Sequence, residues 1–168
     1  IGKGLPGKDF SATLAAPEKA APDAVRDGAL FNYNMLAYLD GDFFYKAVEH
    51  LQKGGKPAEL KAAGVTPNLM KRGAVRSVYD GRYTYTRYFS PKQHNRPVTF
   101  EELVRYNDIE MFDAQSDPRE MTNLAAGEAL SRNRELLMTM NDKLNRLIDS
   151  EVGTDNGQMM PGGIDAGW

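Results

Sequence analysis

The fold is decided by the stretch Asn107-Asp-Ile-Glu-Met-Phe-Asp-Ala-Gln-Ser-Asp-Pro-Arg-Glu-Met-Thr-Asn-Leu124. Its first half predicts a short strand over 109–113. Asp117-Pro118 then predicts a turn, because the residue before proline favours extended geometry and proline pre-sets φ for a turn. Leu124 supplies an apolar anchor. The stretch fixes the order of the chain, since a tyrosine-rich segment precedes it and a long amphipathic segment follows it.

The tyrosine-rich segment, residues 74–89, predicts a β-hairpin. Asp80-Gly81 is a two-residue signal for a type I′ turn, in which both central residues need φ > 0. This turn predicts a register with four cross-strand pairs: Tyr79 opposite Arg82, Val78 opposite Tyr83, Arg76 opposite Tyr85 and Val75 opposite Thr86.

The amphipathic segment predicts one long helix over 128–152, with Gly153 as the residue after its C-terminus. Apolar residues line one stripe at three- and four-residue steps. They are Leu137, Met140, Leu144, Leu147 and Ile148. A sheet that is apolar on one face needs such a cover, so the fold class is α+β: a small antiparallel β-sheet of about four strands packed against a long C-terminal helix.

Further elements are expected on the N-terminal side. They are a strand over 29–35, a helix over 43–52 with Asp42 as its N-cap, a short helix over 58–63, and a short helix from Thr99 to about Tyr106. Residues 1–28 carry Gly and Pro at irregular spacing and predict an extended linking segment. The expected organisation is therefore a linking segment over 1–28, an α+β subdomain over 29–152, and a Gly/Pro/Met tail over 153–168.

The composition sets outer limits. The 168 residues are 41% hydrophobic and 26% charged, with net charge −2 and no Cys, which is typical of a soluble globular protein. The absence of Cys excludes disulfides and thiolate chemistry within the chain. No apolar run approaches the ~20 residues of a membrane span, and no signal peptide is visible. The chain starts with Ile1 rather than Met, so we expect it to begin inside a longer protein.

Charge is uneven along the chain. Residues 71–96 hold seven basic residues against Asp80 alone, interleaved with five aromatic residues. One interpretation is a face that binds polyanions or single-stranded nucleic acid. The interpretation we favour is a hairpin whose aromatic residues pack and whose charges are solvated.

Few residues suit a self-sufficient catalytic site. The two histidines, His50 and His94, lack the spacing of a zinc site. Asp40-Gly41-Asp42 lacks the further oxygen ligands of a calcium loop, so a turn and helix cap is the better interpretation. The sequence has no phosphate-binding glycine loop, no dinucleotide fingerprint and no nucleophile elbow.

The ordered motifs resemble the C-terminal part of sulfatases. The hairpin strands Ala74-Val-Arg-Ser-Val-Tyr-Asp-Gly-Arg-Tyr-Thr-Tyr-Thr-Arg-Tyr88 resemble the family's basic, tyrosine-rich strands. Glu110-Met-Phe-Asp113, Asp117-Pro118-x-Glu120 and Asn123-Leu124-Ala125 resemble its run E-L-Y-D-L-x-x-D-P-x-E-x-x-N-L-A. Gly4-Leu-Pro-Gly-Lys-Asp-Phe-Ser11 resembles the segment after its catalytic portion. The resemblance covers nearly the whole chain, most strongly residues 74–150.

The resemblance implies an arylsulfatase-like sulfuric ester hydrolase of the alkaline-phosphatase superfamily. In that family an N-terminal α/β domain carries a formylglycine nucleophile, made from Cys or Ser in Cys/Ser-x-Pro-x-Arg, and a calcium ion. Those residues map to nothing here, and the nearest match, Ser116-Asp-Pro-Arg-Glu120, ends in Glu instead of Arg. The implied role is a C-terminal portion that is not catalytic alone, holds no cofactor itself, and supports the catalytic domain.

The implied partners are the chain's own N-terminal catalytic domain and a small sulfate-ester substrate, with a homo-oligomer also open, and without nucleic acid or membrane. The parent would be a soluble protein of the bacterial cytoplasm or periplasm. Candidate substrate-binding residues are polar side chains on a strand or a loop, namely Asn32, Tyr33, Asn34, His94 and Arg96. The alternatives are a portion of a related phosphonate or phosphate monoester hydrolase, or a non-enzymatic polyanion-binding or oligomerisation module.

Overall fold

The computed structural model describes residues 7–34 and 40–154, and its chain divides into two compact units. Among the described residues, the first unit holds 7–31, 77–86 and 109–154, and the second holds 32–34, 40–76 and 87–108. The division cuts across the strands of the sheet.

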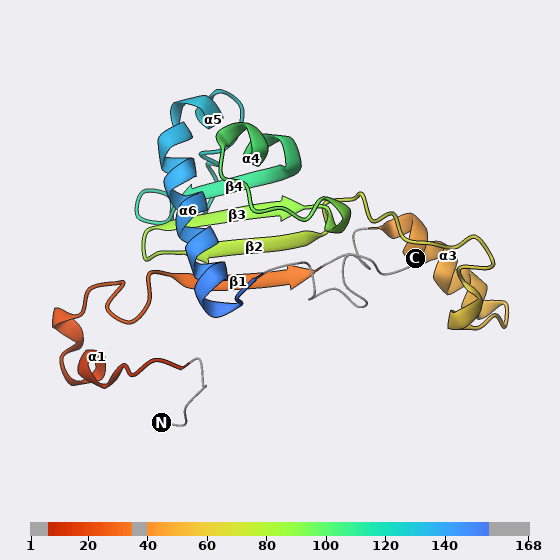
Figure 1. Cartoon of the computed structure of the whole chain (residues 1–168), viewed down its shortest axis with the longest axis horizontal. Helices are drawn as coiled ribbons and strands as arrows, with labels where there is room; N and C mark the ends of the chain where they lie inside the picture. The colour runs from red at the N-terminus through yellow and green to blue at the C-terminus, as the bar shows by residue number, and fades with distance from the viewer. Residues whose placement is uncertain (1–6, 35–39, 155–168) are drawn as a thin grey trace. The chain divides into compact units, whose positions relative to one another are not determined.

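The sheet has four strands in the order β1-β2-β3-β4. Neighbouring strands run in opposite directions (Figure 1). Their bounds are Ala29–Asn34, Ala74–Tyr79, Tyr83–Phe89 and Asn107–Asp113. This confirms the predicted fold class. β4 begins two residues before the predicted strand, and Met35, predicted to end β1, lies outside the described residues.

The hairpin between β2 and β3 is confirmed, but its predicted register is wrong by two residues. The backbone N–H of Asp80 donates to the Tyr83 carbonyl at 3.2 Å, and the hydroxyls of Ser77 and Thr86 lie 2.8 Å apart across the strands. The central turn residues are therefore Gly81 and Arg82. Only Gly81 has positive φ, +97°, as in a type II′ turn.

The cause of this shift is the Asp80 side chain. Its carboxylate accepts the N–H groups of Arg82 at 3.1 Å and Tyr83 at 2.8 Å, so Asp80 closes the turn instead of entering it. A shift of two residues keeps every side chain on its predicted face. Val78 and Tyr85 consequently still point together into the core, both fully buried.

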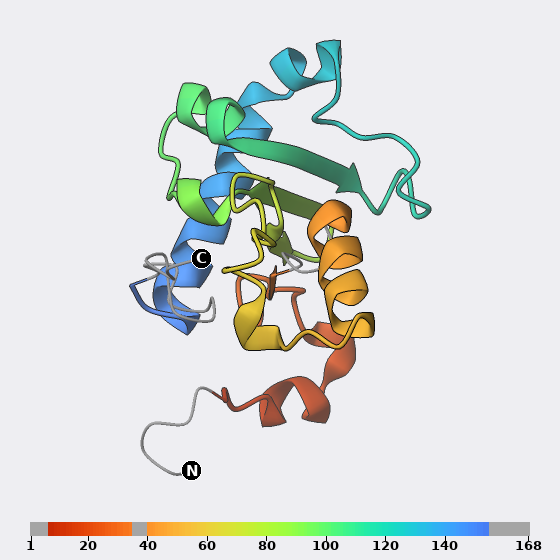
Figure 2. The ribbon, with the colours of Figure 1, turned by 90° about the vertical axis from the view of Figure 1, so that its right-hand side faces the viewer.

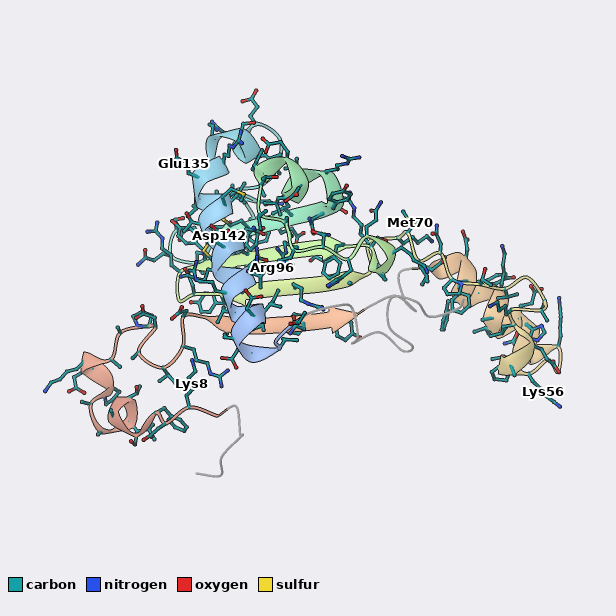
Figure 3. The ribbon with its side chains drawn as sticks, viewed as in Figure 1. Lys8, Lys56, Met70, Arg96, Glu135 and Asp142 are labelled. Atoms are coloured by element: carbon teal, nitrogen blue, oxygen red, sulfur yellow. The ribbon has the colours of Figure 1, made fainter. Side chains whose placement is uncertain are left out.

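The C-terminal helix is two helices, α5 (Glu128–Arg132) and α6 (Arg134–Glu151), where one was predicted. Asn133 separates them because it leaves helical geometry, and its amide donates to the Leu124 carbonyl at 2.9 Å. The predicted stripe is confirmed, with all five of its residues buried. Glu135 and Asp142, labelled in Figure 3, lie on the exposed side of α6, and Gly153 has the predicted positive φ, +88°.

Two carboxylates, one on the hairpin and one on β4, form ion pairs within the first unit. Asp80 accepts Lys143 of α6 at 2.7 Å, and Asp113 accepts Arg82 at 2.8 Å. Hydrogen bonding from Arg82 lowers the pKa of Asp113 to about 2. Burial acts most strongly on Asp80 and would raise its pKa, but the hydrogen bonds from Lys143 and two backbone N–H groups prevail and lower it. Both carboxylates therefore stay charged at neutral pH.

The outer edge of β4 is covered by the chain's own next segment. Asn123 accepts the Met111 N–H at 3.1 Å through its Oδ1, and the Leu124 N–H donates to the Met111 carbonyl at 2.7 Å. In Figure 2 the chain turns after β4 and runs back beside the strand towards α5. Asn123 and Leu124 thus replace a fifth strand, so the Asn-Leu pair of the sequence motif has a structural role.

Helices α1 and η1 lie in the first unit, over Ser11–Ala15 and Pro17–Lys19. The second unit holds α3 (Gly41–Gln52), η2 (Pro57–Glu59), η3 (Pro91–Gln93) and α4 (Phe100–Tyr106). The Thr99–Glu102 capping box of α4 is confirmed. The predicted helix over 58–63 is wrong: it is only the 3₁₀ turn η2.

A close approach at Gly28 gives the first prediction. An added Cβ would lie 2.7 Å from Val78 Cγ2 and 2.9 Å from the Tyr79 carbonyl oxygen. We expect Gly28→Ala to lower the free energy of unfolding by roughly 1–3 kcal/mol through overpacking, measured by urea denaturation. Gly7→Ala is the matched control, because its Cβ would meet nothing within 4 Å. Equal stability of the two variants would contradict the described packing.

The edge cover gives the second prediction. Asn123→Ala leaves the N–H groups of Met111 and Ala125 without their side-chain acceptor, and we expect a loss of about 1–3 kcal/mol in the free energy of unfolding. Asn123→Asp keeps an acceptor oxygen and should recover most of the loss. Thr122→Ala, at an exposed neighbouring position, should change little. An Asn123→Ala protein as stable as the Thr122→Ala control would refute the edge role.

Candidate functional site

The predicted substrate-binding residues lie on two segments of the second unit. Asn32, Tyr33 and Asn34 are on β1, whereas His94 and Arg96 are on the loop between η3 and α4. Tyr33 is 46% exposed. The carbonyl oxygen Oδ1 of Asn32 is buried and accepts no hydrogen bond.

The loop that carries His94 and Arg96 is held in a defined shape. The N–H of His94 donates to the Pro91 carbonyl at 3.4 Å, and its ring meets the Phe89 ring edge-on with centroids 5.3 Å apart. The Asn95 amide donates to the Gln93 carbonyl at 2.7 Å. Arg96, labelled in Figure 3, is exposed. The loop therefore presents a cation on a pre-formed turn.

Sequence reasoning missed a polar pocket at the start of α3. Its volume is about 180 Å³, and its lining includes Asp40, Asp42, Lys46, Thr66, Asn68 and Lys71. The sequence signal was the Asp40-Gly41-Asp42 cap, but the predicted N-cap, Asp42, is wrong. The helix starts at Gly41, and Asp40 is the N-cap, accepting the Phe43 N–H at 3.3 Å.

Asp40 is the anchor of this pocket. Its carboxylate accepts Lys71 Nζ at 2.7 Å and the Asn68 N–H at 2.6 Å, and the residue is only 3% exposed. The hydrogen bond from Lys71, followed by that from Asn68, lowers the pKa of Asp40 to about 2. Asp40 is thus ionised at neutral pH and unsuited to donate a proton, so it positions the pocket while Lys46, Thr66 and Lys71 remain as donors.

The basic segment 71–96 does not form a continuous cationic face. Lys71 pairs with Asp40, Arg72 with Asp108 and Arg82 with Asp113. Arg76 and Arg87 are buried, at 5% and 2% exposure. Arg82, Lys92 and Arg96 are the exposed cations of the segment. Five of the seven cations are thus at least partly exposed, as the solvated-charge interpretation expects, and the carboxylate partners of three of them weigh against the polyanion-binding interpretation.

Residues 7–34 and 40–154 contain no group of three or more His, Cys, Asp or Glu side chains placed to hold a metal ion. His50 lies 3.9 Å from Glu59 on the second unit. Within the same described ranges, no helix is both long and apolar enough to span a bilayer.

Comparison with known proteins supports a loose relation to sulfatases. No protein-family model matches the chain. An N-acetylglucosamine-6-O-sulfatase of Bacteroides thetaiotaomicron is 28% identical over 106 residues, which cover 56% of this chain and 19% of the relative. The chain thus spans about a fifth of the length of the curated relative it matches. The hairpin and the β4 edge cover, whose sequences resemble sulfatase motifs, contribute packing and hydrogen bonds in this structure.

The Asp40 anchor gives the third prediction. A carboxylate whose folded-state pKa is depressed contributes stability that is present above its ordinary pKa of about 4 and lost as pH falls towards 2. Asp40→Asn should lower the free energy of unfolding by roughly 1–3 kcal/mol at pH 7, because it leaves Lys71 without its acid. The difference between wild type and Asp40→Asn should shrink as pH falls from about 5 to 2 in urea unfolding.

The control for this prediction is Asp42→Asn, an exposed carboxylate on the first turn of the same helix. It should cost less at pH 7. An Asp40→Asn difference that stays constant from pH 7 to 2 would show that the ion pair does not supply the stability.

Proposed function

We propose that the chain is the C-terminal portion of a sulfatase-type hydrolase of sulfate esters. The observation that carries the proposal is the motif order: hairpin, β4, edge cover and terminal helix occur in the order expected of that family, and the matched relative is a sulfatase. In this proposal the chain stabilises the catalytic domain and contributes to one wall of the substrate pocket.

The chemistry of the proposed enzyme belongs to the part of the parent outside this chain. The family's Cys/Ser-x-Pro-x-Arg motif maps to no residues here. The proposal therefore assigns the formylglycine nucleophile and the calcium ion to the catalytic domain. We assign the residues of this chain no step of the reaction.

His94 and Arg96 are the residues we propose for contact with substrate. A guanidinium group suits the oxygens of a sulfate ester because it donates several N–H groups in a fixed plane. The hydrogen bonds of Asn95 hold the loop before the substrate arrives, which reduces the entropy lost on binding. Asn32 and Tyr33 would supply neutral polar contacts from β1, and Asn34 stays a candidate from the sequence.

The fourth prediction concerns activity. We expect the full product of the gene that encodes these residues to hydrolyse 4-nitrophenyl sulfate, and the 168-residue chain alone to be inactive. In the full product, Arg96→Ala should reduce kcat/KM by tenfold to a hundredfold, the equivalent of roughly 1.5–3 kcal/mol for a hydrogen bond to a charged group.

The matched control is Lys56→Ala, since Lys56 is an exposed cation of the same unit outside the proposed site (Figure 3). Turnover by the 168-residue chain would refute the assignment of the chemistry to another domain. A full product that hydrolyses a phosphonate or phosphate monoester but no sulfate ester would replace the proposed substrate class.

A further inference from the structure

Helix α3 presents an apolar stripe to solvent. Phe44, Val48 and Leu51 recur at the i, i+4, i+7 spacing of one helix face, and Tyr45 adjoins them. Phe44 is 52% exposed, Leu51 is 42% exposed and Tyr45 is 69% exposed. None of the twelve residues of α3 is buried. We call Phe44, Tyr45, Val48 and Leu51 the α3 stripe.

This exposure contrasts with α6. That helix has the same amphipathic design and buries seven side chains. A helix of about twelve residues is marginal in water unless its apolar face is packed. The ends of α3 are well defined by the Asp40 cap and by Gly54, whose φ is +88°. The helix is therefore locally specified, while its apolar face is left open in the described residues.

We propose that the α3 stripe is the surface through which this chain docks on the catalytic domain of its parent protein. The inference rests on the proposed function. The sulfatase relative supplies the reason for this occupant. The matched region is only 19% of that protein, so a parent of similar length would carry a further domain in the same polypeptide as this portion.

The chemistry of the stripe fits a permanent interface within one polypeptide. It carries two aromatic and two aliphatic side chains and no charge, like the fully buried centre of a stable interface. The exposed cation Lys46, two positions after Phe44, lies on the opposite face of the helix from Phe44. Asp40 fastens the start of α3 to Asn68 and Lys71, so the stripe is held in place before docking.

Hydrogen exchange tests the proposal without substitutions. Amide exchange is compared between the 168-residue chain and the full product of the gene that encodes it. The amides of Phe44 to Leu51 should exchange at least tenfold more slowly in the full product. The amides of α6 serve as the internal reference and should differ little. Equal exchange of α3 in both proteins, or a gene product with no further domain, would overturn the proposal.

Paired variants identify the stripe as the cause. The double variant Phe44→Gln/Leu51→Gln replaces two apolar side chains of the stripe with glutamine, which helices tolerate. Lys46→Gln introduces glutamine on the opposite face of the helix. In the full product, the stripe variant should lose the extra protection of α3, and Lys46→Gln should keep it. Circular dichroism of both variants within the 168-residue chain checks that α3 still folds. A folded stripe variant that retains the protection would contradict the proposal.

These measurements separate the docking surface from the activity. A full product that protects α3 but hydrolyses no sulfate ester would remove the proposed function and leave the docking surface standing. An active sulfatase with unprotected α3 would do the reverse. Protection that grows with the concentration of the 168-residue chain alone would identify a second copy as the occupant and overturn the proposal.

Discussion

Burial of the apolar face of α6 is the interaction on which the rest of the first unit depends. An isolated two-stranded hairpin is at best marginally stable in water and needs a further element packed against it. Helix α6 supplies this packing with five buried apolar side chains. Each fully buried side chain of this size contributes about 1.5–3 kcal/mol before entropy is counted. The polar contacts then fix the position of the helix: Asn141 accepts the Tyr85 hydroxyl at 3.3 Å, and Lys143 reaches Asp80 at the hairpin turn.

Pairing of the hairpin cations is the second constraint, and it changes what the chain can recognise. Three of the seven basic residues of segment 71–96 have carboxylate partners and two are buried. Part of their positive charge is therefore used within the fold, where it is matched by carboxylates. In the 90–98 loop, Lys92 and Arg96 are exposed and His94 is half-buried.

The elements were predictable from the sequence because they rest on local signals. The alternation of the hairpin, the stripe of α6 and the Thr99–Glu102 box all act within a few residues. Two predicted details, the hairpin turn and the start of α3, are wrong for one reason. The carboxylate of Asp80 accepts backbone N–H groups at the turn, and that of Asp40 accepts one at the helix start. The ion pairs Arg82–Asp113 and Lys143–Asp80 join residues 31 and 63 positions apart. Sequence patterning carries no information on such pairs, and the pocket around Asp40 and Lys71 was missed for that reason.

The segment that covers β4 contains two kinds of residue: those that hydrogen-bond to the strand and those that form the connecting turn. Asn123 and Leu124 occupy the backbone groups of Met111, so their distance from the strand is fixed by hydrogen bonds. The connecting residues 114–119 make a turn at the surface, and lengthening a surface connection costs little entropy. Insertions at this tip would therefore leave the anchor and its spacing to α5 unchanged. Length variation in this region would consequently diversify the surface without opening the sheet to pairing with another molecule.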